Sequence, residues 1–276
     1  MLSILNNISA LSSRNQLSLT QASLSKTLLA LSSGSRINSG ADDAAGLAIA
    51  DGLNANITAL TQSSRNATDG VGQLQVADGA LSQVTALLNR AITLATESST
   101  GTVSDSQRTA LNAEFTAIKT EIDTIGGKTT YNGQAIFGAT SNLTVYMSDS
   151  SAAGTSSVSV TIGQVDSGHL GAVSLTGNDL STAANAQTAI GNINSAIAAI
   201  ANLRGTLGAS SNQLQAASNV MQNQIQNLTA AEDGIRAADI GQETANLSKF
   251  TVLQQTGIAA LQQSNQSQQA VLRLLQ

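Results

Sequence analysis

The sequence predicts a mainly α-helical protein of long antiparallel heptad helices that form a coiled-coil-like rod, with a small β-hairpin region in the middle of the chain. Two runs place an apolar residue at every seventh position, which keeps one stripe of a helix against a partner. The 276 residues include no proline, a residue that would interrupt such helices. They include no cysteine, three Phe, two Tyr and no Trp, so aliphatic side chains must form the core.

The two heptad runs lie in opposite halves of the chain. The first consists of Leu53, Leu60, Ala67, Leu74, Leu81, Leu88 and Ala95. The second consists of Ile193, Ile200, Leu207, Leu214, Met221, Leu228 and Ile235. Because each stripe needs an apolar partner, the simplest arrangement is a hairpin of helices in which each run buries the other.

A first helix is expected over residues 3–33, where leucine and isoleucine recur at helical spacings. A segment rich in serine and glycine interrupts it. Asp42 and Asp43 then lie at the start of the next helix, where carboxylates interact favourably with the helix dipole, or they are ion-pair partners of Arg36. This second helix carries the first heptad run to about residue 96.

A shorter helix should follow the first heptad helix. Ser104 and Gln107 match the capping box that starts a helix, and Gly126-Gly127 should end it. Glycines inside the preceding helix each cost about 1 kcal/mol relative to alanine, which predicts close backbone approach or a helix that depends on assembly. They are Gly46, Gly52, Gly70, Gly72 and Gly79.

The centre of the chain should hold short strands. Asn132-Gly133 is a strong turn signal. Apolar and polar residues alternate on both sides of a polar stretch, which predicts a loose hairpin near residues 140–165. Residues 163–180 carry no periodic pattern and should be irregular, with His169 on an exposed loop. The second heptad helix should begin near residue 181.

The last helical segment, residues 242–276, is amphipathic and nearly uncharged, as is the first helix. Isolated helices are marginal in water, so both ends need partners, either each other or other copies of the chain. We therefore expect paired terminal helices over residues 1–40 and 237–276, disordered in the monomer, and a rod domain over residues 41–236. The apolar residues expected to drive assembly are Leu5, Ile8, Leu28, Leu31, Leu247, Phe250, Leu253, Leu261, Leu272 and Leu275.

Composition argues against several functions. The formal net charge of −5 and the low charged content of 11% argue against nucleic-acid binding, which needs clustered basic residues. A chain with one histidine and no cysteine has no thiol chemistry and no metal centre built on several histidines, and we expect no cofactor. No apolar run approaches the roughly 18 residues of a membrane span. The start of the chain lacks the pattern of a cleaved signal peptide.

Motifs on both sides of the chain resemble those of bacterial flagellins. On the N-terminal side they are LSSGSRINSGADDAAG (31–46), SRNATDG (64–70), ADGAL (77–81) and YNG (131–133). On the C-terminal side they are ANLSK (245–249), LQQTG (253–257) and VLRLL (271–275). The likeness covers about residues 1–138 and 178–276, and only the middle segment is not matched by motif.

The resemblance implies a structural protein that is no enzyme, is exported through the flagellar type III apparatus and polymerises into the extracellular filament used for motility. In this family the paired terminal helices form the inner tube of the filament, and the heptad helices form a surrounding rod. The implied partners are other copies of the chain, an export chaperone, the filament cap and hook-junction proteins. The alternative within the family is a hook–filament junction protein, although the continuous heptads and short middle favour the filament subunit.

The resemblance also selects Arg90, Leu94 and Glu114, which lie where flagellins sensed by Toll-like receptors carry their recognition residues. Arg90 and Leu94 are one helical turn apart and should share a face. Thr93 replaces an acidic residue of that pattern. In the alternative interpretation these residues make rod and subunit contacts. The contrasting class is a hydrolytic enzyme, since some flagellins carry protease inserts, but the middle of this chain holds no metal-binding His-Glu pattern.

Overall fold

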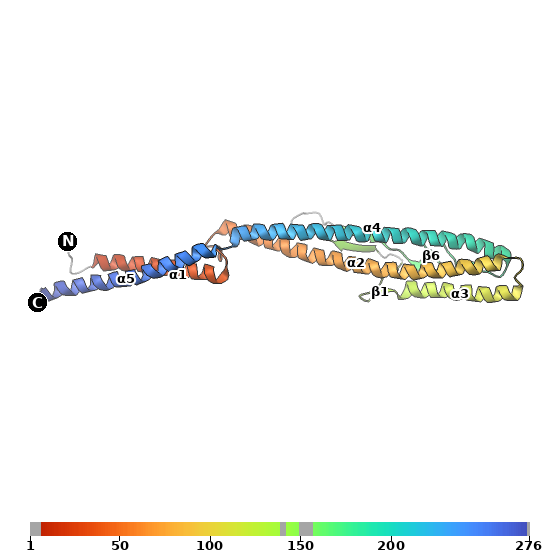
Figure 1. Cartoon of the computed structure of the whole chain (residues 1–276), viewed down its shortest axis with the longest axis horizontal. Coiled ribbons are helices and arrows are strands. Elements are labelled where there is room, and N and C mark those ends of the chain that lie inside the picture. The colour runs from red at the N-terminus through yellow and green to blue at the C-terminus, as the bar shows by residue number, and fades with distance from the viewer. Residues whose placement is uncertain (1–6, 139–141, 149–156, 275–276) are drawn as a thin grey trace. The chain divides into compact units, whose positions relative to one another are not determined.

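The computed structural model describes residues 7–138, 142–148 and 157–274. Within these ranges the helices are α1 (Ile8–Ser33), α2 (Ala44–Ser99), α3 (Asp105–Lys128), α4 (Ala183–Arg236) and α5 (Ile240–Leu274). The strands are β1 (Thr130–Tyr131), β2 (Gln134–Ala135), β3 (Asn142–Tyr146), β4 (Ser157–Thr161), β5 (Val165–Asp166) and β6 (His169–Leu170). The predicted fold class, mainly helical with short strands in the middle of the chain, is confirmed (Figure 1).

The chain forms two compact units. We call residues 1–55 and 227–276 the terminal unit and residues 56–226 the central unit; α2 and α4 contribute to both. Among the helices of the described ranges, none combines the length and the apolar content that crossing a membrane requires.

Helices α2 and α4 run antiparallel through the central unit. The hydroxyl oxygens of Ser64 and Ser218 lie 3.0 Å apart, and Arg204 donates from Nε to Asp78 Oδ1 at 2.7 Å. These two contacts are separated by 14 residues along α2 (78 − 64) and by 14 along α4 (218 − 204). The helices therefore keep one register between the two contacts.

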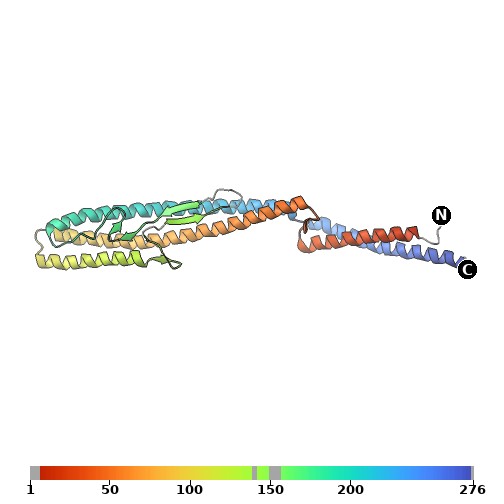
Figure 2. The same cartoon turned by 180° about the vertical axis from the view of Figure 1, so that it is seen from behind.

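The heptad stripes form the core of the central unit. Eleven of their members are at most 5% exposed: Leu60, Ala67, Leu74, Leu81, Leu88, Ala95, Ile193, Ile200, Leu207, Leu214 and Met221. The other three, Leu53, Leu228 and Ile235, belong to the terminal unit and are only half-buried. The predicted mutual burial is thus complete only in the central unit, where α3 and the strands add further cover (Figure 2).

Helix α3 begins as predicted and ends later. The Ser104 side chain accepts from the Gln107 amide, and the Gln107 side chain accepts from the Ser104 amide, which completes the capping box. The helix ends at Lys128, one residue beyond the predicted Gly126-Gly127 end. A Cβ on Gly126 would lie 1.6 Å from the carbonyl oxygen of Val165. Glycine is therefore needed here so that β5 can lie directly on the helix.

The strands form three small antiparallel pairs in the described residues. Asn132 and Gly133 have φ of 48° and 76° and make the predicted turn between β1 and β2. Strands β3 and β4 pair over their full lengths, as the alternation predicts, while the connecting residues 149–156 lie outside the described residues. The expectation that residues 163–180 are irregular is corrected, since β5 and β6 pair there. Two-residue strands are too short for alternation to reveal.

A buried arginine joins the end of α2 to the start of α3. Arg108, which is 6% exposed, donates to the carbonyl oxygens of Ser98, Thr100 and Val103. The cation thus satisfies carbonyl groups at and just beyond the helix C-terminus and complements the helix dipole. The Ser98 hydroxyl donates to the carbonyl of Leu180 at 2.7 Å, which ties the same corner to the segment before α4.

Leu81→Ala or Leu214→Ala should lower the free energy of unfolding by about 2–5 kcal/mol, because each side chain is fully buried and its loss leaves a cavity. Val220→Ala is the matched control: this valine lies on α4 beside Met221 but is 56% exposed, and its change should stay within about 0.5 kcal/mol. Chemical denaturation followed by helical circular dichroism measures all three. Equal denaturation midpoints for the three variants would contradict the burial of the heptad stripes of α2 and α4 against each other.

Candidate assembly surface

Helices α1 and α5 form an antiparallel pair in the terminal unit, and few of the side chains between them are both apolar and fully buried (Figure 1). Asn7 donates from Nδ2 to Gln268 Oε1 at 2.9 Å, and Gln254 donates from Nε2 to Gln21 Oε1 at 2.7 Å. The side chains of α1 that are buried are Thr20, Leu24, Thr27 and Ala30. No side chain of α5 from residue 240 to residue 270 is fully buried. Two of the four buried residues carry hydroxyls, so the pair buries little apolar surface.

The side of α1 that faces away from α5 is also apolar. Leu11, Leu19 and Leu29 are 56%, 63% and 54% exposed. Leu11 and Leu29 are about five full turns apart, so they lie on one face of the helix. Ile8 is 71% exposed. Ile8 and Leu19 are about three turns apart, so they share a second stripe next to that of Leu11 and Leu29. Helix α1 therefore has apolar residues on two opposite sides, of which α5 covers one.

Helix α5 leaves its own apolar residues open. Val252, Leu253 and Ile258 are 57%, 41% and 43% exposed. Among the described residues, the large exposed apolar side chains of the central unit are only Val76, Tyr146 and Val220. Exposed apolar surface is thus concentrated in the terminal unit. Such concentration is typical of an interaction surface.

The predicted assembly residues divide by exposure. Ile8, Leu28 and Leu253 are exposed, whereas Leu31, Leu247, Phe250 and Leu261 are half-buried between the helices. Leu5 and Leu275, and the side chain of Leu272, lie outside what the structure describes. The prediction did not select Leu11, Leu19, Leu29, Val252 or Ile258. A second stripe on α1 at intervals of 11 and 18 residues was the signal that could have found three of them.

The loop between α1 and α2 is bonded to the junction of α4 and α5. Gly34 ends α1 with φ of 69°, and its carbonyl accepts from the Ala238 amide at 2.9 Å. The Arg36 amide donates to the carbonyl of Arg236 at 2.7 Å, and Arg36 Nη2 donates to the carbonyl of Ile235 at 2.8 Å. These bonds hold the beginnings and ends of four helices together within the terminal unit.

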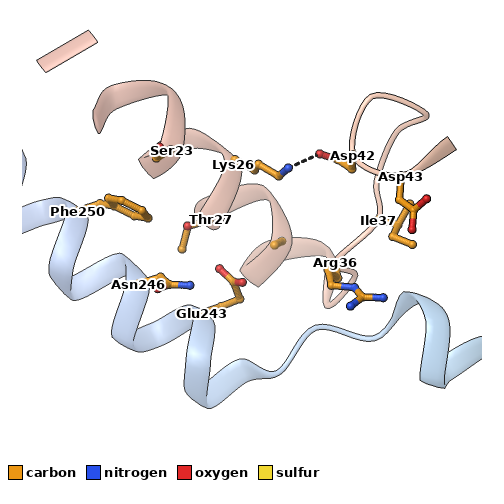
Figure 3. Close-up of a pocket in the computed structure, with 11 residues that line it drawn as sticks. Ser23, Lys26, Thr27, Arg36, Ile37, Asp42, Asp43, Glu243, Asn246 and Phe250 are labelled. Atoms are coloured by element: carbon orange, nitrogen blue, oxygen red, sulfur yellow. Dashed lines mark ion pairs between the residues drawn. The ribbon is translucent and has the colours of Figure 1, made fainter. Parts of the chain in front are cut away.

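Asp42 holds this loop to α1. Lys26 Nζ lies 2.8 Å from Asp42 Oδ1, while Asp42 Oδ2 accepts from the amides of Asn38 and Ser39 (Figure 3). These bonds, with Lys26 first, lower the pKa of Asp42 to about 2. Asp43 accepts from the Gly46 amide at 2.9 Å and so caps α2. The expected role of the pair at the helix start is thus filled by Asp43, and the ion-pair partner of Asp42 is Lys26 rather than Arg36.

A shallow cavity of about 490 Å³ lies beside this loop. Glu243, Asn246 and Phe250 of α5 face Thr27 of α1 across it (Figure 3). The described residues contain no group of three or more His, Cys, Asp or Glu side chains that could hold a metal ion. The residues around this cavity join α1, α5 and the loop between α1 and α2 through packing and the Lys26–Asp42 ion pair.

The three residues selected by resemblance to receptor-sensed flagellins are not all accessible. Arg90 donates from Nε to Glu114 Oε1 at 2.7 Å, and both side chains are about half exposed, at 54% and 44%. Leu94 is 1% exposed and belongs to the core of the central unit. Although Arg90 and Leu94 are one helical turn apart, Leu94 is buried and Arg90 reaches solvent, so the two do not form one accessible face. A receptor contact through these residues stays a prediction.

These features define a class of protein. The central unit has a core of its own, while the terminal unit presents apolar helix sides that nothing within the described residues covers. A helical subunit of this kind is built to associate with other chains.

Comparison with known proteins gives the family. The chain matches the model of the bacterial flagellin N-terminal helical region over residues 4–142 and that of the C-terminal helical region over residues 190–275. It is 36% identical over 272 residues to a flagellin of Halalkalibacterium halodurans and 33% identical over 301 aligned positions to one of Bacillus subtilis, with 98% of each chain covered in both comparisons. The chain belongs to the bacterial flagellin family and is a structural subunit of the extracellular flagellar filament.

The chain is also similar to a filament core protein and to a solved flagellin structure. The chain is 32% identical to a flagellar filament 31.3 kDa core protein of Treponema maltophilum, with 98% of this chain and 99% of the relative covered. A crystal structure of Bacillus cereus flagellin matches 61% of this chain and 94% of its own at 28% identity and a TM-score of 0.49.

Asp42→Asn should loosen the loop over residues 34–43 near neutral pH, because the loop amides lose a charged acceptor. A carboxyl whose pKa is lowered from 3.8 to about 2 stabilises the fold above about pH 4 and loses this effect as the pH falls toward 2. The difference between wild type and variant should therefore shrink in acid. Amide-exchange protection of the loop, corrected for intrinsic rates, measures it. A difference that persists unchanged at pH 2 would contradict the ion-pair assignment.

Proposed function

We propose that copies of this chain polymerise through the open sides of α1 and α5, which build the inner tube of the filament while the central unit forms the surrounding rod. The observation that carries the proposal is the exposure of Leu11, Leu19 and Leu29 on the side of α1 away from α5. Burial of apolar surface contributes roughly 25 cal/mol per Å², and for this side of α1 it is available only between chains.

The two helices offer different surfaces to a neighbour. The open side of α1 carries leucines, whereas α5 offers Val252, Leu253 and Ile258 among uncharged polar residues. A contact between unlike surfaces is heterologous, and when its rotation does not close it generates an open helical polymer. The sparse charge of the chain, 11% of residues, adds little repulsion between copies. Both properties support a filament rather than a closed oligomer.

The proposal extends to export and to the other partners. A terminal unit with open apolar sides needs cover before assembly, which fits delivery through the flagellar type III apparatus with an export chaperone. The filament cap and the hook-junction proteins would then contact the same helices at the two ends of the polymer. We further propose that residues 1–40 and 237–276 are disordered in the monomer, because the interface between α1 and α5 buries little apolar surface.

Removal of residues 261–276 should stop filament growth, because it deletes the end of α5 and the apolar contacts it makes. The heptad core of the central unit remains whole, so the monomer should keep most of its helical circular dichroism. Sedimentation of seeded full-length and truncated protein compares the two. Pelletable filaments of normal length from the truncated chain would show that the terminal helices are not the assembly element.

The double change Leu19→Ser and Leu29→Ser tests the open side of α1 directly. Both leucines are more than half exposed, so monomer stability should stay within about 0.5 kcal/mol of wild type. Seeded growth should slow or stop, because the apolar contact between copies is lost. Val220→Ser, an equally exposed change in the central unit, is the control and should leave growth unaffected. Normal growth of the double variant would place the contact elsewhere.

A further inference from the structure

The tip of the β1–β2 hairpin is chemically unusual in this chain. Asn132-Gly133 is the one Asn-Gly pair in the sequence. Both residues are exposed and have positive φ, 48° and 76°. Apart from Gly133 and its two chain neighbours, no heavy atom lies within 4 Å of the position that a Cβ on Gly133 would take. The hairpin tip is therefore open to solvent around Gly133.

The hairpin that carries this tip is short. Each strand has two residues, and the ladder pairs Thr130 with Ala135 and Tyr131 with Gln134. Asn132 and Gly133 lie outside the paired positions. The exposed turn can therefore sample other backbone conformations more readily than a residue inside a helix.

We propose that Asn132 is a site of spontaneous deamidation. The Gly133 nitrogen attacks the side-chain carbonyl carbon of Asn132, forms a new C–N bond and loses its proton. The side-chain amide nitrogen leaves as ammonia, which gives a five-membered succinimide. Water then opens the ring at either carbonyl and yields aspartate, or isoaspartate in which the main chain runs through the former side chain. The reaction needs water alone and neither oxidant nor enzyme.

Other asparagines followed by small residues are better protected. Asn194 precedes Ser195 inside α4, where the helix fixes the backbone. Asn38 precedes Ser39, but the Ser39 backbone nitrogen donates to Asp42 Oδ2 at 3.1 Å. The side-chain Nδ2 of Asn38 donates to the carbonyl of Ser35 at 2.7 Å. Neither restraint has a counterpart at the hairpin tip. The structure thus ranks Asn132 above both.

The consequence of isoaspartate would be local. The segment is anchored before the hairpin by the Thr129 amide on the carbonyl of Ile125, and after it by Ile136, which is 0% exposed. The extra backbone atom must then be absorbed between these anchors. Tyr131 is the residue at risk, because its hydroxyl packs 3.2 Å from where a Cβ on Gly72 would lie. In a long-lived extracellular filament such a mark accumulates with the age of the subunit.

The first experiment is peptide mapping by mass spectrometry of purified full-length protein assembled into filaments, after prolonged incubation at mildly alkaline pH. We expect the acid product, including isoaspartate, to form several-fold faster at Asn132 than at Asn38 or Asn194. Protein unfolded in urea gives the intrinsic preference for a following glycine, and the ratio of the rates at Asn132 and Asn38 should be larger in the folded protein than in this reference. Equal rates at the three sites in the folded protein would overturn the proposal.

The second experiment follows Tyr131. The chain has two tyrosines and no tryptophan, so Tyr146→Phe leaves Tyr131 as the sole reporter in near-ultraviolet circular dichroism. Incubation should reduce its signal while helical circular dichroism stays constant. Asn132→Asp is the matched control, because it introduces the charge without the longer backbone and should keep the signal. Loss of the signal in Asn132→Asp would show that charge, not isoaspartate, releases the tyrosine and would overturn the backbone part of the inference.

Discussion

Burial of the heptad stripes of α2 and α4 against each other is the interaction on which the rest of the central unit depends. The chain has no disulfide and almost no aromatic residue to form an alternative core. Smaller elements attach to this seam and fit it closely: a Cβ on Gly70 would lie 2.8 Å from Val145 of β3 and 3.2 Å from Leu214 of α4. Glycine within α2 therefore weakens the isolated helix but allows three segments to meet.

Polar contacts give the seam its register. Stripes of leucine and alanine that repeat every seven residues would pack almost equally well after a slip of one heptad. The contacts Ser64–Ser218 and Asp78–Arg204 exist in one register only, and Arg204 lowers the pKa of the Asp78 carboxyl by hydrogen bonding to it. The apolar stripe thus provides the stability and the polar pairs provide the specificity. This division is the usual one in coiled coils.

The features that depend on local sequence alone could be predicted. The heptad stripes, the Ser104 capping box and the Asn132-Gly133 turn each follow from spacing or backbone preference, and the structure holds all three. The features that depend on a segment distant in the sequence could not be predicted. Gly126 is needed for the close approach of β5, which lies about forty residues away in sequence and cannot be predicted locally. Lys26 became the partner of Asp42 for the same reason.

The candidate surface was predicted only in part because α1 is apolar on two sides. Spacing identifies apolar residues on a helix but does not say which side the partner helix takes, so the half-buried Leu31 and the exposed Leu28 were selected together. In the structure, Thr20 and Thr27 are buried at positions where leucine would give a more stable pair of helices. A stronger interface between α1 and α5 would stabilise the monomer without adding to the contacts between copies. In the proposed assembly, the apolar surface left outside would link the stability of the two ends to contacts with neighbouring copies.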